Sequence, residues 1–398
     1  MKVRSLSAIL LLVALSLAAC GRDAVESPEA PTTRSVGEPA EPPAPVAGPP
    51  APAAEPALDW PAPNYDHFST RATFESRIDS GSVHGLTEAW RYELPAGAPF
   101  GAAATTPIVI DGTVYVGDLL TNVHTVDLAT GDRRWLAKVD TAVFGPSGVA
   151  VGWGKVFANK GGTEVAAYSA ESGDELSATN LVESGGAINI QPVVADGKVL
   201  ATASSLSQVG ARGVLFALDQ ETGAIRWSFD TIESDDLWSH PELNGGGSAW
   251  YPSAVDLAKG VSYWGTSNPY PFPGAPGFPN GASWPGDNRW TNSILALDLD
   301  TGRLRWGHQA VAHDLFDHDA VLAAVADLTD EGQGQVIIST GKLGRVIGLD
   351  PSGTVLWETP AGMHKNDDLD SFQGELEVLP GASSPRLPWR TASSTCRS

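Results

Sequence analysis

The feature of this 398-residue chain that most restricts its fold is a short hairpin sequence that returns several times. The pattern Ala-Leu-Asp-x-x-Thr-Gly-x-x-x-Trp occurs at Ala217–Trp227 and Ala296–Trp306, with weaker copies at Val126–Trp135, Ala167–Ser177 and Gly348–Trp357. The glycine of each turn supplies the positive φ that a tight hairpin needs. Each copy therefore predicts two antiparallel strands joined by a turn.

A strand-like run precedes most copies, at Gly112–Gly117, Gly197–Ala201, Gly260–Trp264 and Gln335–Ser339. Repeats of roughly 40 to 50 residues with four short strands each are typical of propeller blades. We therefore expect an all-β fold, a β-propeller of four-stranded blades, with a further strand at Leu86–Leu94 that carries Trp90. The recurring tryptophans are expected to be structural and to pack over the turn of the next blade: Trp135, Trp227, Trp306 and Trp357.

The start of the chain predicts export. Lys2 and Arg4 precede an apolar run that is too short to span a membrane, and Leu-Ala-Ala-Cys follows it. A cysteine in this position forms a bacterial lipobox, so we expect a lipoprotein signal peptide over residues 1–19 and a lipid on Cys20. The protein would then sit in the cell envelope, held to the membrane by its lipid anchor only. An ordinary signal peptide with an incidental cysteine is the alternative.

Composition divides the rest of the chain. Residues 20–57 are rich in Ala, Pro and Glu, which predicts a disordered tether because too little apolar surface is available for burial. The propeller is expected over residues 58–380. Residues 381–398 contain three arginines and no acidic residue, an atypical basic tail in a chain of formal net charge −22. That charge argues against nucleic acid as a partner.

Cys20 and Cys396 are the only cysteines, so no disulfide framework is expected.

The stretch from Gly245 to Asp319 carries the residues with chemical potential. Trp250 offers a flat aromatic face to a planar cofactor, and Asn268, Asp317 and Asp319 carry oxygens that suit a hard cation. On an extended segment Asp317 and Asp319 would point to opposite faces, so both reach one ion only if the backbone turns between them.

The same stretch resembles the pyrroloquinoline-quinone (PQQ) dependent alcohol dehydrogenases, the quinoproteins, and among them the polyvinyl-alcohol and methanol dehydrogenase branches. Four motifs occur in the family's order: Gly245–Gly247 leading to Trp250, the turn Gly265–Pro269, the run Pro285–Trp290, and the run His313–Asp317. The family's ring has eight blades, so the resemblance implies that this chain holds about five to six of them. A smaller complete propeller remains the alternative.

The resemblance implies roles for particular residues. Trp250 would lie beneath the PQQ rings, and Lys342 would hydrogen-bond the quinone oxygens. Arg212 matches a cofactor-side arginine whose role stays open. Asp317 would be the catalytic base that takes the hydroxyl proton of an alcohol while hydride passes to a metal-polarised quinone.

The metal implied by the resemblance is calcium or a lanthanide ion, bound by Asn268 and Asp317 and, as in the lanthanide-using branch, by Asp319. One position departs from the family. Its metal-binding glutamate falls at Ser207 or Gln208, so only the neutral oxygen of Gln208 is offered there.

Three functions follow from these observations. The first is an exported quinoprotein that oxidises a small-molecule or polymeric alcohol and passes electrons to a cytochrome or quinone. The second is a non-catalytic PQQ-like propeller lipoprotein that acts as a scaffold or binding module, and the third is a truncated inactive copy. The loop Tyr270–Pro285, with Phe272, Phe278 and Trp284, is expected to set substrate size.

Overall fold

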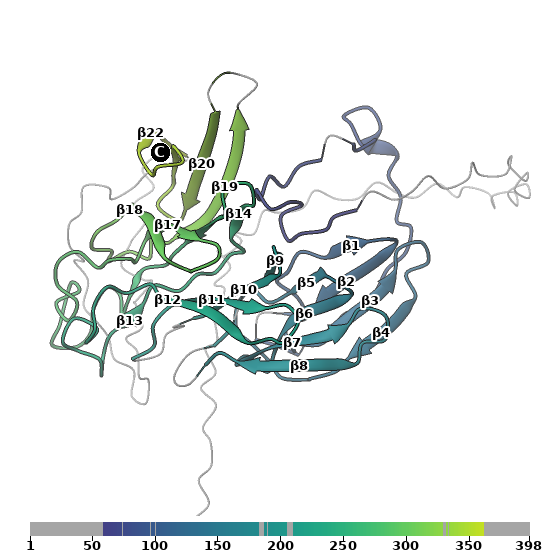
Figure 1. Ribbon diagram of the computed structural model, residues 1–398, viewed down its shortest axis with the longest axis horizontal. Coiled ribbons are helices and arrows are strands. Elements are labelled where there is room, and N and C mark those ends of the chain that lie inside the picture. Colours follow the sequence, from purple (N-terminus) through teal and green to yellow (C-terminus); the bar gives the residue numbers. More distant parts are fainter. Residues whose placement is uncertain are drawn as a thin grey trace, which may run out of the picture. The chain divides into compact units, whose positions relative to one another are not determined.

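Antiparallel sheets of four strands each dominate the computed structural model, which describes residues 59–361 apart from positions 74, 96, 100, 183–186, 189, 205–209, 329–331 and 333 (Figure 1). The signal peptide, the tether, Cys20, Gln208 and the basic tail predicted above lie outside the described residues, and the domain boundaries stay predictions. Within the described part no helix is long and apolar enough to cross a membrane.

Five such sheets are described, each formed by strands that are close in sequence. Their strands are β1–β4 (Ile108–Ile110, Thr113–Gly117, Val123–Asp127, Arg133–Ala137), β5–β8 (Val149–Gly152, Lys155–Lys160, Glu164–Ser169, Glu175–Asn180), β9–β12 (Val193–Ala195, Lys198–Ala203, Val214–Asp219, Ile225–Asp230), β14, β15, β17 and β18 (Ala254–Asp256, Val261–Gly265, Ser293–Asp298, Leu304–Gln309), and β19–β22 (Ala320–Leu328, Gly334–Gly341, Arg345–Leu349, Val355–Pro360).

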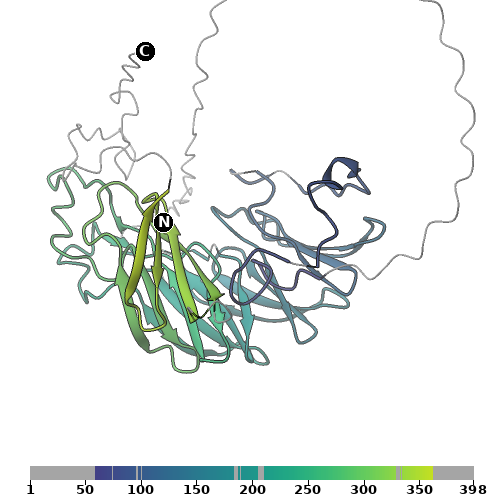
Figure 2. The ribbon, with the colours of Figure 1, turned by 90° about the horizontal axis from the view of Figure 1, so that it is seen from above.

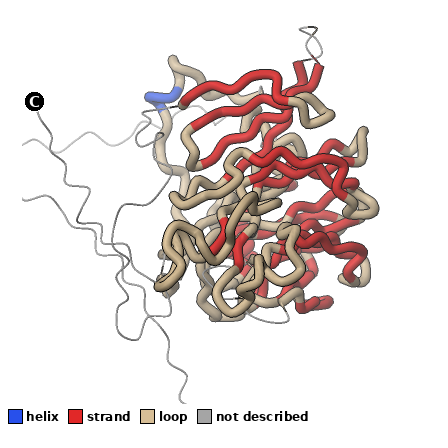
Figure 3. The backbone as a smooth tube through the Cα atoms, turned by 90° about the vertical axis from the view of Figure 1, so that its left-hand side faces the viewer, coloured by secondary structure: helices blue, strands red, loops and turns tan. Residues whose placement is uncertain are grey.

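Outside the five sheets, β13 (Gly245–Gly246) pairs with β16 (Pro269–Tyr270), and the described part holds one short 3₁₀ helix, η1 (Val83–Gly85) (Figure 3). The five sheets confirm the expected all-β fold of four-stranded propeller blades. The predicted strand-like runs also fall on strands, for example Gly260–Trp264 on β15.

Apolar clusters fill the space between consecutive sheets, which follow one another in chain order (Figure 2). One cluster, for instance, joins Leu215 and Trp227 of the third sheet to Val255 and Leu295 of the fourth. In each sheet the first three strands are more buried than the fourth, as the burial patterns of β10 and β12 illustrate. Each sheet thus becomes stable by covering the apolar face of the next one.

The repeated tryptophans join neighbouring sheets. The indole N–H of Trp227 donates to the carbonyl of Leu299 at 2.9 Å, and its ring packs on Gly302, where a Cβ atom would come within 2.6 Å of the ring. Trp135 and Trp306 make the same two contacts with the next turn, at Ala170 and Pro351 respectively. Trp357 differs from the prediction. It is 41 % exposed because β22 has no following sheet among the described residues.

The predicted strand at Leu86–Leu94 is wrong, since that segment is extended without strand pairing. Its tryptophan nevertheless packs as expected. The indole N–H of Trp90 donates to Leu128 at 2.7 Å, and the ring lies against Gly131. A docking tryptophan therefore needs only the turn it covers, whereas a strand also needs a hydrogen-bonding neighbour.

A segment ahead of the first sheet crosses the inner edges of four sheets, and we call residues 59–71 the strap. Trp60 exchanges two backbone hydrogen bonds with Val109 of β1. The ring of His67 contacts the carbonyl of Val194 on β9 at 2.8 Å. The carbonyls of His67 and Phe68 accept from Val255 of β14 and Val325 of β19. The strap thus forms hydrogen bonds with backbone groups that would otherwise be unpaired at exposed strand edges.

Candidate active site

A cavity of about 250 Å³ collects side chains from five separate parts of the chain. We call it the Trp250 pocket. It lies among the loops around β13, β16, β19, and the β20–β21 turn, together with the segment before β5. Its lining consists of Phe144, Gly246, Ser248, Trp250, Ser267, Asn268, Tyr270, Phe272, Asp317 and Lys342.

The glycine run brings two of these parts together. Gly246 has φ of 123°, and a Cβ atom there would lie 2.6 Å from the carbonyl oxygen of Asn268. The backbone N–H of Gly247 donates to that same oxygen at 3.2 Å. Only glycine allows this close backbone approach, which sets Trp250 beside the Asn268 turn.

Trp250 itself is half-buried. Its indole nitrogen is buried and has no hydrogen-bond partner among the described residues. An unpaired buried N–H is costly to leave in an apolar setting. The ring therefore offers the pocket both an apolar face and a donor that no described group uses.

The backbone turns at Asp317, as the sequence required for the two carboxylates to meet. Its φ is 63°, a left-handed conformation that aspartate tolerates better than most residues. As a result Nζ of Lys342 lies 2.8 Å from a carboxylate oxygen of Asp317 and 2.7 Å from one of Asp319. The three charged groups form one cluster at the edge of the pocket.

Asp319 is 1 % exposed, and both of its oxygens are engaged. One accepts from the backbone N–H of Asn268 at 2.8 Å and the other from Lys342. Burial and the nearby charge of Asp317 raise the pKa of Asp319 to about 6, although Lys342 and Asn268 oppose the shift. Burial alone would lower the pKa of Lys342, but its hydrogen bonds to the two carboxylates raise it overall. Lys342 therefore stays protonated.

Asn268 is buried at the opposite side of this cluster. Its side-chain NH₂ group donates to the carbonyl of Pro269 at 2.7 Å, which leaves the side-chain oxygen as the group able to bind a cation.

Sequence reasoning missed the residue that shapes the loop before β19. Asp314 is 1 % exposed and accepts from the backbone N–H groups of Phe316 at 2.8 Å and His318 at 2.6 Å and from Asn292 at 2.9 Å. Burial opposes its ionisation, but the hydrogen bond from the side chain of His318, at 3.1 Å, and then the backbone N–H groups of Phe316 and His318 lower its pKa overall. A charged acceptor thus fixes the turn that presents Asp317. The signal for Asp314 that was available in the sequence was its position directly after His313 in the His-Asp run.

The loop Tyr270–Pro285 divides into two parts. Tyr270 and Phe272 line the pocket. Trp284 is fully buried, donates to the carbonyl of Pro271 at 3.0 Å, and lies 4.5 Å from the ring of His313. Phe278 packs against His240. Only Phe272 of the three predicted aromatic residues therefore faces the pocket.

Three predicted site residues are absent from the described pocket lining: Asp319, which is buried beside it, Arg212 and Gln208. Arg212 pairs with Asp230 at 3.0 Å and donates to the carbonyl of Asp235 at 2.6 Å, and it is absent from the pocket lining. Gln208 lies outside the described residues, as does Ser207.

The residues present fit PQQ and a hard cation in their chemistry. Trp250 supplies a stacking face with an unused donor, Lys342 supplies a positive charge for an anionic cofactor, and Asn268 and Asp317 supply oxygen ligands. Asp319, predicted as a further ligand, instead has both oxygens engaged by Lys342 and Asn268. Among the described residues no group of three or more His, Cys, Asp or Glu side chains is placed to hold a metal, so the amide oxygen is a needed part of the donor set.

Comparisons with known proteins point the same way. The family profile described as the PQQ glucose/ethanol/alcohol dehydrogenase β-propeller domain matches residues 60–150 and 154–361. The chain is 30 % identical to a quinohemoprotein alcohol dehydrogenase of Comamonas testosteroni over 311 residues, which cover 70 % of this chain and 43 % of that protein. It is 27 % identical over 307 residues to methanol dehydrogenase (cytochrome c) subunit 1 of Methylorubrum extorquens, covering 66 % of this chain and 47 % of that protein.

Solved structures show the same similarity. The crystal structure of the Comamonas testosteroni quinohemoprotein alcohol dehydrogenase matches with a TM-score of 0.66 and 27 % identity, covering 76 % of this chain and 49 % of that one. A europium-containing methanol dehydrogenase matches with a TM-score of 0.66 and 25 % identity, covering 76 % and 58 %. The chain spans about half the length of the curated relatives it matches.

Proposed function

Because the chain belongs to the family of PQQ-dependent glucose, ethanol and alcohol dehydrogenase β-propellers, we propose that it oxidises an alcohol in the Trp250 pocket. The observation that carries this proposal is the convergence of Trp250, Asn268, Asp317 and Lys342 on one cavity from separate parts of the chain. When bound, PQQ would supply the electron-accepting carbon, and a calcium or lanthanide ion would polarise it.

Asp317 is the base in this proposal. Its carboxylate is about one-third exposed, so a substrate hydroxyl can reach it, and Lys342 holds one of its oxygens at 2.8 Å. A carboxylate that substrate can reach in this way can act as a general base. Asp319 holds the ammonium of Lys342 from the buried side and thereby positions it.

Trp250 would bind the planar cofactor by its face. Asn268 and Asp317 would hold the cation, with Gln208 as a further oxygen donor. Phe144 and Phe272 line the same cavity and would exclude water from the reacting atoms.

The test measures two properties of the full chain. Purified protein is titrated with PQQ in the presence of calcium or a lanthanide, and dye-linked alcohol oxidation is followed. The proposal expects a metal-dependent absorbance change and turnover that Asp317→Asn lowers by at least about 100-fold, the lower range for loss of a general base. Cofactor binding without turnover in either protein would favour the alternative, a non-catalytic binding module. No cofactor binding at all would favour a scaffold or an inactive copy.

Export and electron transfer also belong to the proposal. We expect a lipid on Cys20 in the cell envelope, which Cys20→Ser would abolish together with membrane association. The electrons would pass to a cytochrome or quinone, a partner class supported by the similarity to a methanol dehydrogenase named for cytochrome c.

A further inference from the structure

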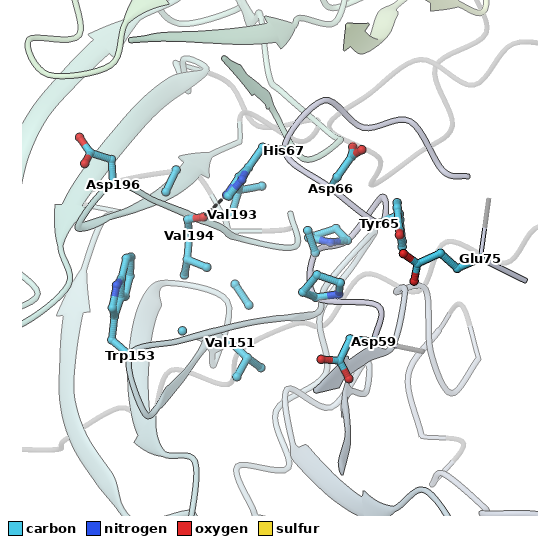
Figure 4. A pocket seen from close by; sticks show the side chains of 16 residues that line it. Asp59, Tyr65, Asp66, His67, Glu75, Val151, Trp153, Val193, Val194 and Asp196 are labelled. Atoms are coloured by element: carbon cyan, nitrogen blue, oxygen red, sulfur yellow. Dashed lines mark hydrogen bonds between the residues drawn. The ribbon is translucent and has the colours of Figure 1, made fainter. Parts of the chain in front are cut away.

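A second cavity, of about 550 Å³, lies between the strap and the hairpins that follow β5 and β9 (Figure 4). We call it the strap cavity. It shares no lining residue with the Trp250 pocket. Residues of β5 and Trp153 directly after it line the strap cavity, whereas Phe144, ahead of β5, lines the Trp250 pocket. The volume of the strap cavity is typical of sites for small organic ligands.

The walls of the strap cavity are mostly apolar. Val151 and Val193 contribute from the inner strands, and Pro61 and Pro63 contribute from the strap. Trp153 stands at one end with 44 % of its surface exposed, and Phe157 packs against it edge-on at 6.3 Å. An exposed indole that is fixed by a neighbour offers an aromatic face at little entropic cost.

The other end of the cavity is acidic. Asp59, Asp66 and Glu75 line it, and Figure 4 shows Asp59 and Glu75 on the side away from Trp153. Within the described part of the chain, no lysine or arginine forms an ion pair with any of these three. A fourth carboxylate, Asp196, lies near Trp153 but is paired with Lys198 at 3.1 Å.

We propose that the strap cavity binds an organic cation, an ammonium group attached to an apolar body. The apolar walls would take the hydrocarbon part, since burying it removes apolar surface from water. The ammonium would gain from the three carboxylates at the acidic end, of which Asp66 also accepts hydrogen bonds from Thr70 and Asp59 accepts one from the backbone N–H of Asp111. The face of Trp153 at the other end would pack on the apolar body. The same carboxylates repel organic anions. A bare metal ion is a poor match, because the described residues place no group of three or more metal-binding side chains together.

The test uses the full chain and does not depend on PQQ or on alcohol oxidation. Benzyltrimethylammonium is the probe, and benzenesulfonate, of similar size but opposite charge, is the matched ligand control. Isothermal titration is expected to show saturable binding of the cation at low ionic strength, weakening as salt is added because the carboxylates are screened. The anion is expected not to bind.

Two variants locate the binding. Trp153→Asn removes the aromatic face and keeps a residue that tolerates the local φ of 54°. It is expected to weaken binding about two- to tenfold, the usual size of a contact between two aromatic rings. Glu75→Gln is expected to weaken binding by a similar factor. Glu171→Gln, an exposed acid on the β7–β8 turn, is the control and should leave the affinity unchanged.

Three results would overturn the proposal. The first is no saturable binding of the cation at millimolar concentration. The second is equal binding of benzenesulfonate. The third is unchanged affinity in both Trp153→Asn and Glu75→Gln, provided thermal unfolding shows both variants folded. None of these results bears on the dehydrogenase proposal, because the Trp250 pocket is a separate cavity.

Discussion

Nζ of Lys342 lies 2.7 Å from the buried carboxylate of Asp319, and the same ammonium also contacts Asp317. Gly341, directly before Lys342, makes this possible: a Cβ atom there would lie 1.9 Å from the carbonyl oxygen of Asp319. The close backbone contact between the end of β20 and the residue before β19 therefore positions Lys342 beside the two acids. One cation is shared by two acids that would otherwise repel each other.

Replacing Lys342 with methionine is expected to destabilise the fold. The buried carboxylate of Asp319 would keep only the N–H of Asn268 as a partner, and an unsatisfied buried acceptor costs about 1–3 kcal/mol. Urea unfolding at neutral pH measures the change. Lys138→Met is the matched control, because its ion pair with Asp140 is exposed and worth about 1 kcal/mol or less. An equal loss in both variants would contradict the proposed importance of the buried contact.

Trp227→Ala is expected to cost about 3–5 kcal/mol, since it removes a buried indole and the hydrogen bond to Leu299. Gly302→Ala should also destabilise the fold, because the added Cβ would meet the same ring and φ is 68°. If the two residues act through one contact, the double variant loses less stability than the sum of the losses in the two single variants. Thermal denaturation measures all three proteins. Trp357→Ala, at the same repeat position but exposed, should cost clearly less, and a cost equal to that of Trp227→Ala would be inconsistent with docking.

The turn aspartates are expected to make the fold acid-sensitive. Hydrogen bonds from Arg305 and then Thr301 lower the pKa of Asp298 to about 2, and Asp127 and Asp350 are lowered in equivalent turns. An unfolded aspartate has a pKa of about 3.9. The folded pKa is the lower one, so this stability is complete above about pH 4 and is lost as pH falls towards about 2.

Thermal unfolding of the wild type and Asp298→Asn across that pH range tests the prediction. The variant should melt lower by a few degrees at pH 7, roughly the effect of a 1 kcal/mol change, and the difference should shrink near pH 2. A difference that does not change with pH would show that ionisation of Asp298 is not its source.

Phe272→Ala is expected to change which alcohols are oxidised, given the proposed activity. Phe272 lines the Trp250 pocket, so its loss enlarges the cavity and should lower KM for long-chain alcohols more than for short ones. Phe278→Ala, in the same loop but packed on His240, serves as the control. Steady-state kinetics with a series of primary alcohols gives the comparison, and identical preferences in wild type and Phe272→Ala would remove Phe272 as a determinant of substrate size.

The repeated fold could be predicted from sequence because its causes are local. The turn glycine recurs in all five copies, and an aspartate that caps the turn and a tryptophan four residues after the glycine recur in four of them, within a window of about ten residues. A pattern of that length specifies a hairpin directly. Local sequence alone gave a wrong prediction of a strand at Leu86–Leu94, because these strand-like residues lack a neighbouring strand among the described residues.

The pocket needed the tertiary structure. The positive φ of Asp317, the lysine between the two acids, and the scaffold provided by Asp314 depend on loops from several sheets that meet only after folding. Arg212 illustrates the difference, because its motif indicated a place near the cofactor but only the fold shows its ion pair with Asp230. No sequence pattern predicted the strap cavity. Its carboxylates and Trp153 are far apart along the chain, and only the path of residues 59–71 across the inner strands brings them together.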